Sequence, residues 1–284
     1  MTPRIFFAFM LTLYLLLIIP FTDYLNKRPV AIKLGYSPPA SILKPVLGDQ
    51  RTLAAEWSVL KVLFYYGALI EKAGVNKQYF APPEYYTMFK TIQTSTELDP
   101  YNADAYYFAQ AAFTWEVGRF ADVNGLLDYG MKHRTWDYQL PFFAGFNAAY
   151  FMHDYDKGAS YLKKAADISG NPFFVTLAAR YFYEAGKNDL GVMYLSSMEN
   201  GATDEKVRNV YKIRLEALKA VKLLETAVAG YRQKYGRLPD NVLQLKTRGI
   251  LKELPADPYG GTFYMDSDGK IRSTSKFAFG GGGK

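Results

Sequence analysis

The sequence predicts a mainly α-helical protein with an N-terminal transmembrane helix, a solenoid of helical hairpins and a small C-terminal α+β module with a β-hairpin. The supporting observations are an uncharged N-terminal run, a central pattern that recurs at offsets of 35 and 33 residues, and Pro/Gly turns before an alternating segment near the C-terminus. The expected parts are a 1–22 anchor, a 23–50 Pro-containing linker, 51–200 helical repeats, a 201–222 basic connector helix, the 223–276 module and a 277–284 flexible Gly-rich tail.

Composition narrows the functional classes. The 284 residues are 49% hydrophobic and 17% aromatic, which is too apolar for a disordered chain. The absence of cysteine excludes thiol nucleophiles, disulfides and iron–sulfur ligation. The net charge of +7 includes no dense basic block, so we expect no nucleic-acid binding and favour a solvated surface near an anionic membrane.

The first element is an apolar run from Ile5 to Phe21, 17 residues without a charge. This length is at the short end of what crosses a bilayer. No small-residue cleavage pattern follows it, which favours an uncleaved anchor over a signal peptide. The apolar segment "LPFFAGFNAAYFM" has only 13 residues, so we expect no second span.

The central region contains a repeat that is visible when "GRFADVNGLLDYG", "HDYDKGASYLKKA" and "GKNDLGVMYLSSM" are aligned. The segment "YYTMFKTIQTSTELDP" adds an earlier unit, which ends at Pro100. The middle unit has one extra residue between Gly145 and Tyr155, which predicts a longer or bulged first helix. The aligned positions are Tyr85, Phe120, Tyr155 and Asn188, and then Ile92, Leu127, Leu162 and Leu195.

This spacing resembles the tetratricopeptide repeat (TPR), a helix–turn–helix unit of about 34 residues. Small residues at fixed positions let the paired helices approach, and large ones fill the groove between neighbours. The resemblance implies three or four hairpins between Arg51 and Met198. The matching residues are Tyr107, Ala111, Gly118, Phe120, Leu127 and Gly130 in one unit, and Ala179, Phe182, Gly186 and Leu195 in another.

A long helix is expected from Arg51, upstream of the repeats. We expect it to cap the solenoid and pair with a helix that begins near Glu84. The anchor, the "GYSPP" segment and this helix together resemble a family of bacterial membrane-anchored TPR proteins of poorly defined role. The apolar residues at helical spacing in the helix expected from Arg51 are Trp57, Leu60, Leu63, Phe64 and Ala68.

The resemblance implies a single-pass protein of the bacterial inner membrane. Basic residues flank the apolar run on both sides in nearly equal number, so charge alone does not decide its orientation. Because envelope repeat proteins with one early span usually have their N-terminus inside, we expect the chain from about Tyr24 onward to be periplasmic.

A basic helix is expected after the repeats, with Thr203 as its N-cap and Asp204 and Glu205 in its acidic first turn. It should continue through "LLETAVAGYRQKYG". A solvated connector is favoured over a helix that contacts anionic lipid or an acidic partner.

The segment that starts at Tyr231 resembles the C-terminal globular part of type II secretion major pseudopilins. It departs from that family in two ways: repeats separate it from the N-terminal helix, and the prepilin cleavage site is missing. We expect Leu223 to Ser275 to dock on the last repeat as a cap, so that truncation after Met198 destabilises the repeats. The matching residues are Tyr231, Tyr235, Gly236, Pro239, Leu245, Leu251, Pro255, Asp257, Pro258, Tyr259 and Gly260.

The "DSDG" segment from Asp266 to Gly269 has two interpretations. An EF-hand calcium loop would require a later Glu, which is missing. Alternating residues on both sides of the segment are typical of a β-hairpin. We therefore predict a hairpin turn.

No residues are predicted to be catalytic, to bind a cofactor or to bind a metal. His133 and His153 lack the spacing of a zinc site on one helix. Glu116 and Glu184 fall near the ends of first helices, where solvation or a groove contact is favoured over acid–base chemistry.

The leading hypothesis is a non-enzymatic scaffold that binds a protein partner in the cell envelope. The pseudopilin-like end implies a link to secretion or type IV pilus machinery. The alternative is a glycan- or lipid-binding module that uses the aromatic-rich groove, and an enzyme ranks third. The residues predicted to face the partner-binding groove are Phe108, Ala112, Trp115, Thr176 and Tyr183.

Overall fold

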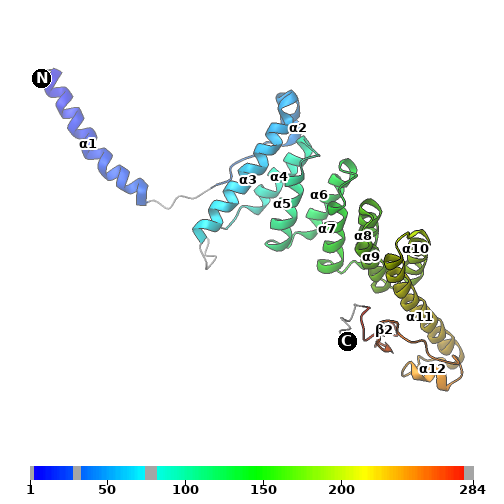
Figure 1. Cartoon of the computed structure of the whole chain (residues 1–284). Coiled ribbons are helices and arrows are strands. Elements are labelled where there is room, and N and C mark those ends of the chain that lie inside the picture. Colours follow the sequence, from blue (N-terminus) through cyan, green and yellow to red (C-terminus); the bar gives the residue numbers. More distant parts are fainter. Residues whose placement is uncertain (1–2, 28–32, 74–81, 278–284) are drawn as a thin grey trace.

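The computed structural model describes residues 3–27, 33–73 and 82–277. In Figure 1 the helices from α2 to α11 stand side by side in a row, and a short hairpin lies near the C-terminal end. The predicted mainly helical class, the apolar N-terminal helix and the small antiparallel sheet are confirmed.

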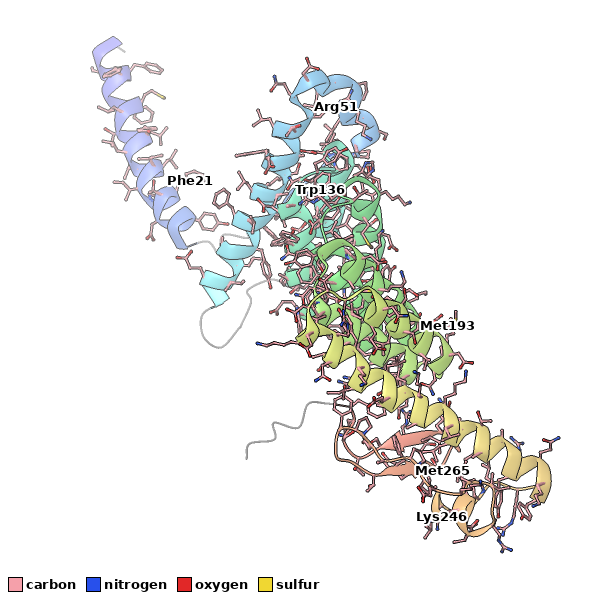
Figure 2. All side chains as sticks on the ribbon, turned by 45° about the vertical axis from the view of Figure 1, so that its right-hand side comes forward. Phe21, Arg51, Trp136, Met193, Lys246 and Met265 are labelled. Atoms are coloured by element: carbon pink, nitrogen blue, oxygen red, sulfur yellow. The ribbon has the colours of Figure 1, made fainter. Side chains whose placement is uncertain are left out.

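The N-terminal helix α1 spans Pro3–Lys27. Its stretch Ile5–Tyr24 has a mean hydropathy of 2.4 and is long and apolar enough to cross a membrane. Side chains project from all sides of this helix into open space (Figure 2). Because α1 continues to Lys27, the predicted linker 23–50 begins inside a helix.

That linker also contains regular structure. Helix α2 spans Ala40–Leu47, and the 3-10 turn η1 spans Gly48–Gln50. Together with α3 (Arg51–Ala73) they form a second apolar stretch, Ala40–Glu71, with a mean hydropathy of 1.3. By length and composition this stretch could also span a membrane, contrary to the expectation of a single candidate.

Helix α3 packs along α4 (Tyr85–Leu98), the partner predicted for it. The side that packs differs from the predicted apolar stripe, because Trp57, Leu60, Leu63 and Phe64 are exposed. The facing side of α4 is rich in Thr and Ser, and the Ser95 hydroxyl donates to the Ala55 carbonyl at 2.9 Å. Such close approach favours small and β-branched residues on α3. The buried face of α3 is Ala55, Val59, Val62, Tyr65 and Leu69.

Three further hairpins follow, and the first helices of two of them end in a π-helical segment. The aligned residues Tyr85, Phe120, Tyr155 and Asn188 each begin the second helix of a hairpin, and Ile92, Leu127, Leu162 and Leu195 are all completely buried. The extra residue in the middle unit is accommodated by the π-helical segment η3, so the predicted bulge is confirmed. The elements are α5 (Ala103–Ala109) with η2 (Gln110–Thr114), α6 (Phe120–His133), α7 (Gln139–Phe146) with η3 (Asn147–Phe151), α8 (Tyr155–Ser169), α9 (Pro172–Glu184) and α10 (Asn188–Gly201).

Glycines allow α7 and α8 to approach closely. A Cβ added to Gly145 would lie 2.9 Å from Leu162 Cγ and 3.2 Å from the Gly158 carbonyl oxygen. A Cβ on Gly158 would lie 2.8 Å from Ala149 Cβ. The two backbones can therefore pack at this distance only if both positions lack a side chain.

Helix α11 spans Glu205–Tyr235 without interruption and ends at Gly236, whose φ is +72°. The predicted boundary between the 201–222 connector and the 223–276 module therefore lies inside one helix. The N-cap is Asp204 rather than Thr203, because the Asp204 carboxylate accepts from the backbone N–H groups of Lys206 and Val207 at 2.7 and 3.1 Å.

The C-terminal module contains α12 (Leu243–Thr247) and strands β1 (Phe263–Met265) and β2 (Ile271–Ser273). The strands pair antiparallel, with Met265 opposite Ile271. In the turn that connects the two strands, the Asp266 carboxylate accepts from the backbone N–H groups of Asp268 and Lys270. The predicted hairpin turn is confirmed.

Two large apolar cores lie within the described residues. One joins α3 through α7, and the other joins α8 through α11. Leu245, Ile271 and Phe277 of the C-terminal segment are buried in the second core. The module therefore shares its core with the last hairpin. The predicted tail 277–284 lies outside the described residues from 278 onward.

Candidate functional site

An aromatic cluster with exposed rings lies where two successive hairpins turn. Trp115 follows η2, Phe120 begins α6, and Phe146, Tyr150 and Phe151 belong to the end of α7 and to η3. We call these five residues the aromatic patch. Two consecutive repeat units build it, so an isolated hairpin would not form it.

The rings of the patch contact one another in a chain. Phe120 stacks on Phe151 with centroids 4.4 Å apart, and Trp115 meets Phe151 edge-on at 5.1 Å. Tyr150 stacks on Phe146 at 5.2 Å. The three Phe rings are half-buried, whereas Trp115 and Tyr150 are 60% and 59% exposed. The patch thus has an apolar floor below two projecting rings that each carry a hydrogen-bonding tip.

A buried amide network links the two π-helical segments beside the patch. Gln110 and Asn147 exchange two side-chain hydrogen bonds, of 3.1 and 2.8 Å. Asn147 Nδ2 also donates to Asn124 Oδ1 at 3.0 Å, and Asn124 Nδ2 donates to the Ala144 carbonyl at 3.1 Å. These bonds fix the register of α5 against α7, and hence the position of Trp115 relative to Phe151.

The predicted groove residues do not form one continuous surface. Among them only Trp115 joins the aromatic patch. Phe108 is half-buried and packs edge-on against Tyr66 of α3 at 6.3 Å, and Ala112 is buried. Thr176 is partly exposed, and its hydroxyl donates to the Phe173 carbonyl at 2.9 Å.

Tyr183 is covered by the C-terminal hairpin. Its hydroxyl donates to the Ile271 carbonyl at 2.9 Å, and its ring meets the Phe277 ring at 5.0 Å. Burial raises the pKa of Tyr183 to about 12. Beside it, Arg272 of β2 pairs with Glu184 of α9 at 2.6 Å. This part of the predicted groove is therefore occupied by the chain itself, and Glu184 makes a groove contact with the hairpin.

A buried cation lies against the docked C-terminal segment. The Arg214 guanidinium of α11 lies 4.9 Å from the Tyr259 ring centroid and 5.7 Å from that of Phe277. Burial lowers the pKa of Arg214. The Asp257 carboxylate accepts from the Ser273 and Ser275 hydroxyls and so ties the Pro/Gly turn to β2.

Gly261 lies in the tight space beside this carboxylate. A Cβ at Gly261 would come within 2.6 Å of an Asp257 oxygen, so the turn needs a glycine there.

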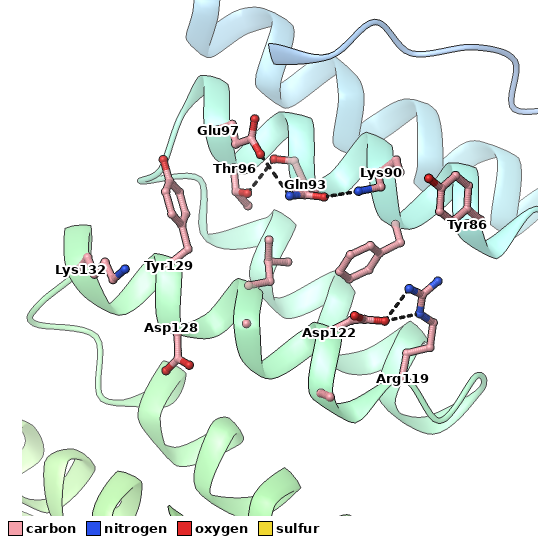
Figure 3. Close-up of a pocket in the computed structure, with 14 residues that line it drawn as sticks. Tyr86, Lys90, Gln93, Thr96, Glu97, Arg119, Asp122, Asp128, Tyr129 and Lys132 are labelled. Carbon is pink, nitrogen blue, oxygen red and sulfur yellow. Dashed lines mark hydrogen bonds and ion pairs between the residues drawn. The ribbon is translucent and has the colours of Figure 1, made fainter. Parts of the chain in front are cut away.

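A concavity lies between α4 and α6, with a volume of about 610 Å³ (Figure 3). Two of its charged side chains, Arg119 and Asp122, pair with each other, and Lys90 donates to Gln93 at 3.1 Å.

The described residues contain no group of three or more His, Asp or Glu side chains that could hold a metal ion. His133 packs against Tyr129 with centroids 4.9 Å apart, and His153 lies in the turn before α8 with a φ of +54°. The two histidines therefore belong to separate structural contexts.

Sequence reasoning missed Phe146, Tyr150 and Phe151. The available signal was the extra residue between Gly145 and Tyr155, because a π-helical turn changes which side chains share a face. The unit that contains the other π-helical segment, η2, has the same length, because Tyr85 and Phe120 are 35 positions apart, as Phe120 and Tyr155 are.

A scan against protein-family models finds no match to this chain, and a search of curated proteins finds no related sequence. The functional argument therefore rests on the geometry above.

Proposed function

We propose that this chain is a membrane-anchored, non-enzymatic scaffold of TPR-like hairpins that binds a protein partner through the aromatic patch. The observation that carries the proposal is the pair of projecting rings, Trp115 and Tyr150, above an aromatic floor. Trp and Tyr dominate the binding energy of protein interfaces when they enter a partner's pocket. The rigid amide network beneath would lower the entropy cost of that binding.

The TPR assignment is supported by the equivalent positions in four hairpins. Each second helix begins at an aligned residue, and each aligned aliphatic residue is fully buried. Because the C-terminal hairpin covers Tyr183, the proposed partner surface is the part formed by α5, α6 and α7. The C-terminal module, docked on the last hairpin, would act as a cap that covers the apolar end of the row, as terminal repeats do in solenoids.

We place the protein in the bacterial inner membrane, with α1 as an uncleaved anchor and the helical row in the periplasm. The pseudopilin-like sequence of the module suggests a partner in secretion or pilus machinery. Reporter fusions at the C-terminus test the orientation. Activity of a cytoplasmic reporter, with no activity of a periplasmic one, would reverse it.

The alternative is a glycan- or lipid-binding site in the same patch. The nearly parallel Phe146 and Tyr150 rings favour it, because flat rings with a polar tip suit sugar faces. A thermal-shift screen separates the two proposals. A sugar or lipid that raises the melting temperature of the wild type, but not of Tyr150→Ala, would favour the alternative.

The decisive test compares two tryptophans of equal exposure. Trp136 is also 60% exposed, but it lies in the turn between α6 and α7 and stacks on Tyr101. A crosslinked complex isolated from membranes should disappear with Trp115→Ala and persist with Trp136→Ala. Equal recovery of the complex with both variants would refute the assignment of the patch.

A further inference from the structure

The exposed side of α3 is an apolar surface with no partner among the described residues. Between Glu56 and Glu71 the only charged residue of the helix is Lys61, which lies at the edge of this side. Leu60 lies three positions after Trp57, Leu63 and Phe64 lie three and four positions after Leu60, and Ile70 lies seven after Leu63, so these residues share one face of the helix. At 1.5 Å per residue the surface is about 20 Å long. We call it the α3 stripe: Trp57, Leu60, Leu63, Phe64 and Ile70.

The opposite side of α3 is firmly part of the folded domain. Val59, Val62 and Leu69 are buried in the core that joins α3 to α7. The Tyr65 hydroxyl accepts from the backbone N–H of Glu84 at 3.0 Å. Because this side faces α4 rather than lipid, α3 cannot serve as a spanning helix, and only the stripe is free to bind something.

A short tether holds the stripe close to the end of α1. Leu34 is buried in the same core as α3, and the Tyr36 carbonyl accepts from Lys61 Nζ at the edge of the stripe at 3.4 Å. Only residues 28–33 separate Lys27 from Leu34, so an extended chain reaches at most about 25 Å. A helical domain tethered this closely to a spanning helix lies next to the bilayer surface.

The charges of this region match an anionic lipid surface. From Tyr24 to Lys72 the sequence has seven basic residues and three acidic ones. Each basic residue near anionic headgroups contributes about 1 kcal/mol of attraction. Trp57 adds a ring of the type that is enriched at headgroup level.

We propose that the α3 stripe lies in the membrane interface, so that α3 is an interfacial helix that lays the helical row along the bilayer. The stripe would enter about 5–10 Å below the headgroup level, as amphipathic interfacial helices do. This contact would fix the direction in which the aromatic patch faces. The inference rests on the anchoring role of α1 in the proposed function.

Because the chain has no cysteine, single-cysteine labelling tests the inference in the full chain. Leu60→Cys places an environment-sensitive fluorophore on the stripe, and Met193→Cys places it on α10, where Met193 is 69% exposed. Leu16→Cys labels α1. The proteins are reconstituted in phosphatidylcholine vesicles that contain phosphatidylglycerol.

We expect spin-labelled lipid to reduce the emission at positions 60 and 16 about twofold or more, and to leave position 193 unchanged. Aqueous iodide should quench only position 193. Circular dichroism checks that each variant is folded.

Two outcomes overturn the inference. Iodide access at position 60 equal to that at 193 would place the stripe in water. Protection from iodide without quenching by lipid would mean that a second copy or another protein covers the stripe. If position 16 also escapes lipid quenching, the anchor itself has failed, whereas quenching at 16 but not at 60 refutes the interfacial helix alone.

Discussion

The buried amide network should be among the most sensitive points of the helical row, and Asn147→Ala tests it. Asn147 is completely buried. The substitution removes both bonds to Gln110 and the bond to Asn124. Gln110 Nε2 and Asn124 Oδ1 are then left without these partners.

The size of the effect follows from these two atoms. A buried polar group without a partner costs about 1–3 kcal/mol, so the two together cost about 2–6 kcal/mol. Water that enters the space left by the amide would recover part of this cost. We therefore expect the free energy of unfolding to fall by about 3 kcal/mol.

Urea unfolding of the full chain in detergent, followed by tryptophan fluorescence, measures this change. Trp57, Trp115 and Trp136 all lie in the helical row, so α1 does not contribute to the signal. The control is Asn209→Ala on the exposed side of α11, which should change stability by less than about 0.5 kcal/mol. A loss for Asn147→Ala equal to that of the control would refute the amide network.

Three further predictions concern packing, pH and the cap. Gly158→Val should lower the melting temperature, because its side chain would collide with Ala149, and unchanged melting would show that α7 and α8 are not this close. Burial raises the pKa of Glu225, so its ionisation costs stability as pH rises from the ordinary 4.5 to the raised value. The variant Glu225→Gln can still accept from Asn188 and should be more stable than the wild type at pH 7, but equally stable at low pH. Equal stability of the two proteins at both pH values would contradict this. Truncation after Gly236 should cost several kcal/mol, because it removes buried side chains of the second core, and an unchanged melting temperature would make the module an independent appendage.

The sequence by itself determined the local features of the fold. The start of each second helix, the buried aliphatic position at its centre and the turn at Asp266 were all readable. Helical periodicity, glycine at left-handed positions and Asp-Gly turns act within a few residues, so they leave their mark in the sequence. The bulge in the middle unit was also visible, because it adds one residue to a regular repeat.

The tertiary structure alone decided which surfaces meet. Sequence spacing identified an apolar stripe on α3 but could not tell that α4 packs on the other side, because both sides carry apolar residues. It placed Tyr183 in an open groove, whereas the Ile271 carbonyl, 88 positions later, accepts a hydrogen bond from its hydroxyl. It found Trp115 but not Phe151, since these rings come from different hairpins. Contacts between distant segments depend on how whole helices stack, and periodicity along one helix carries no information about its neighbour.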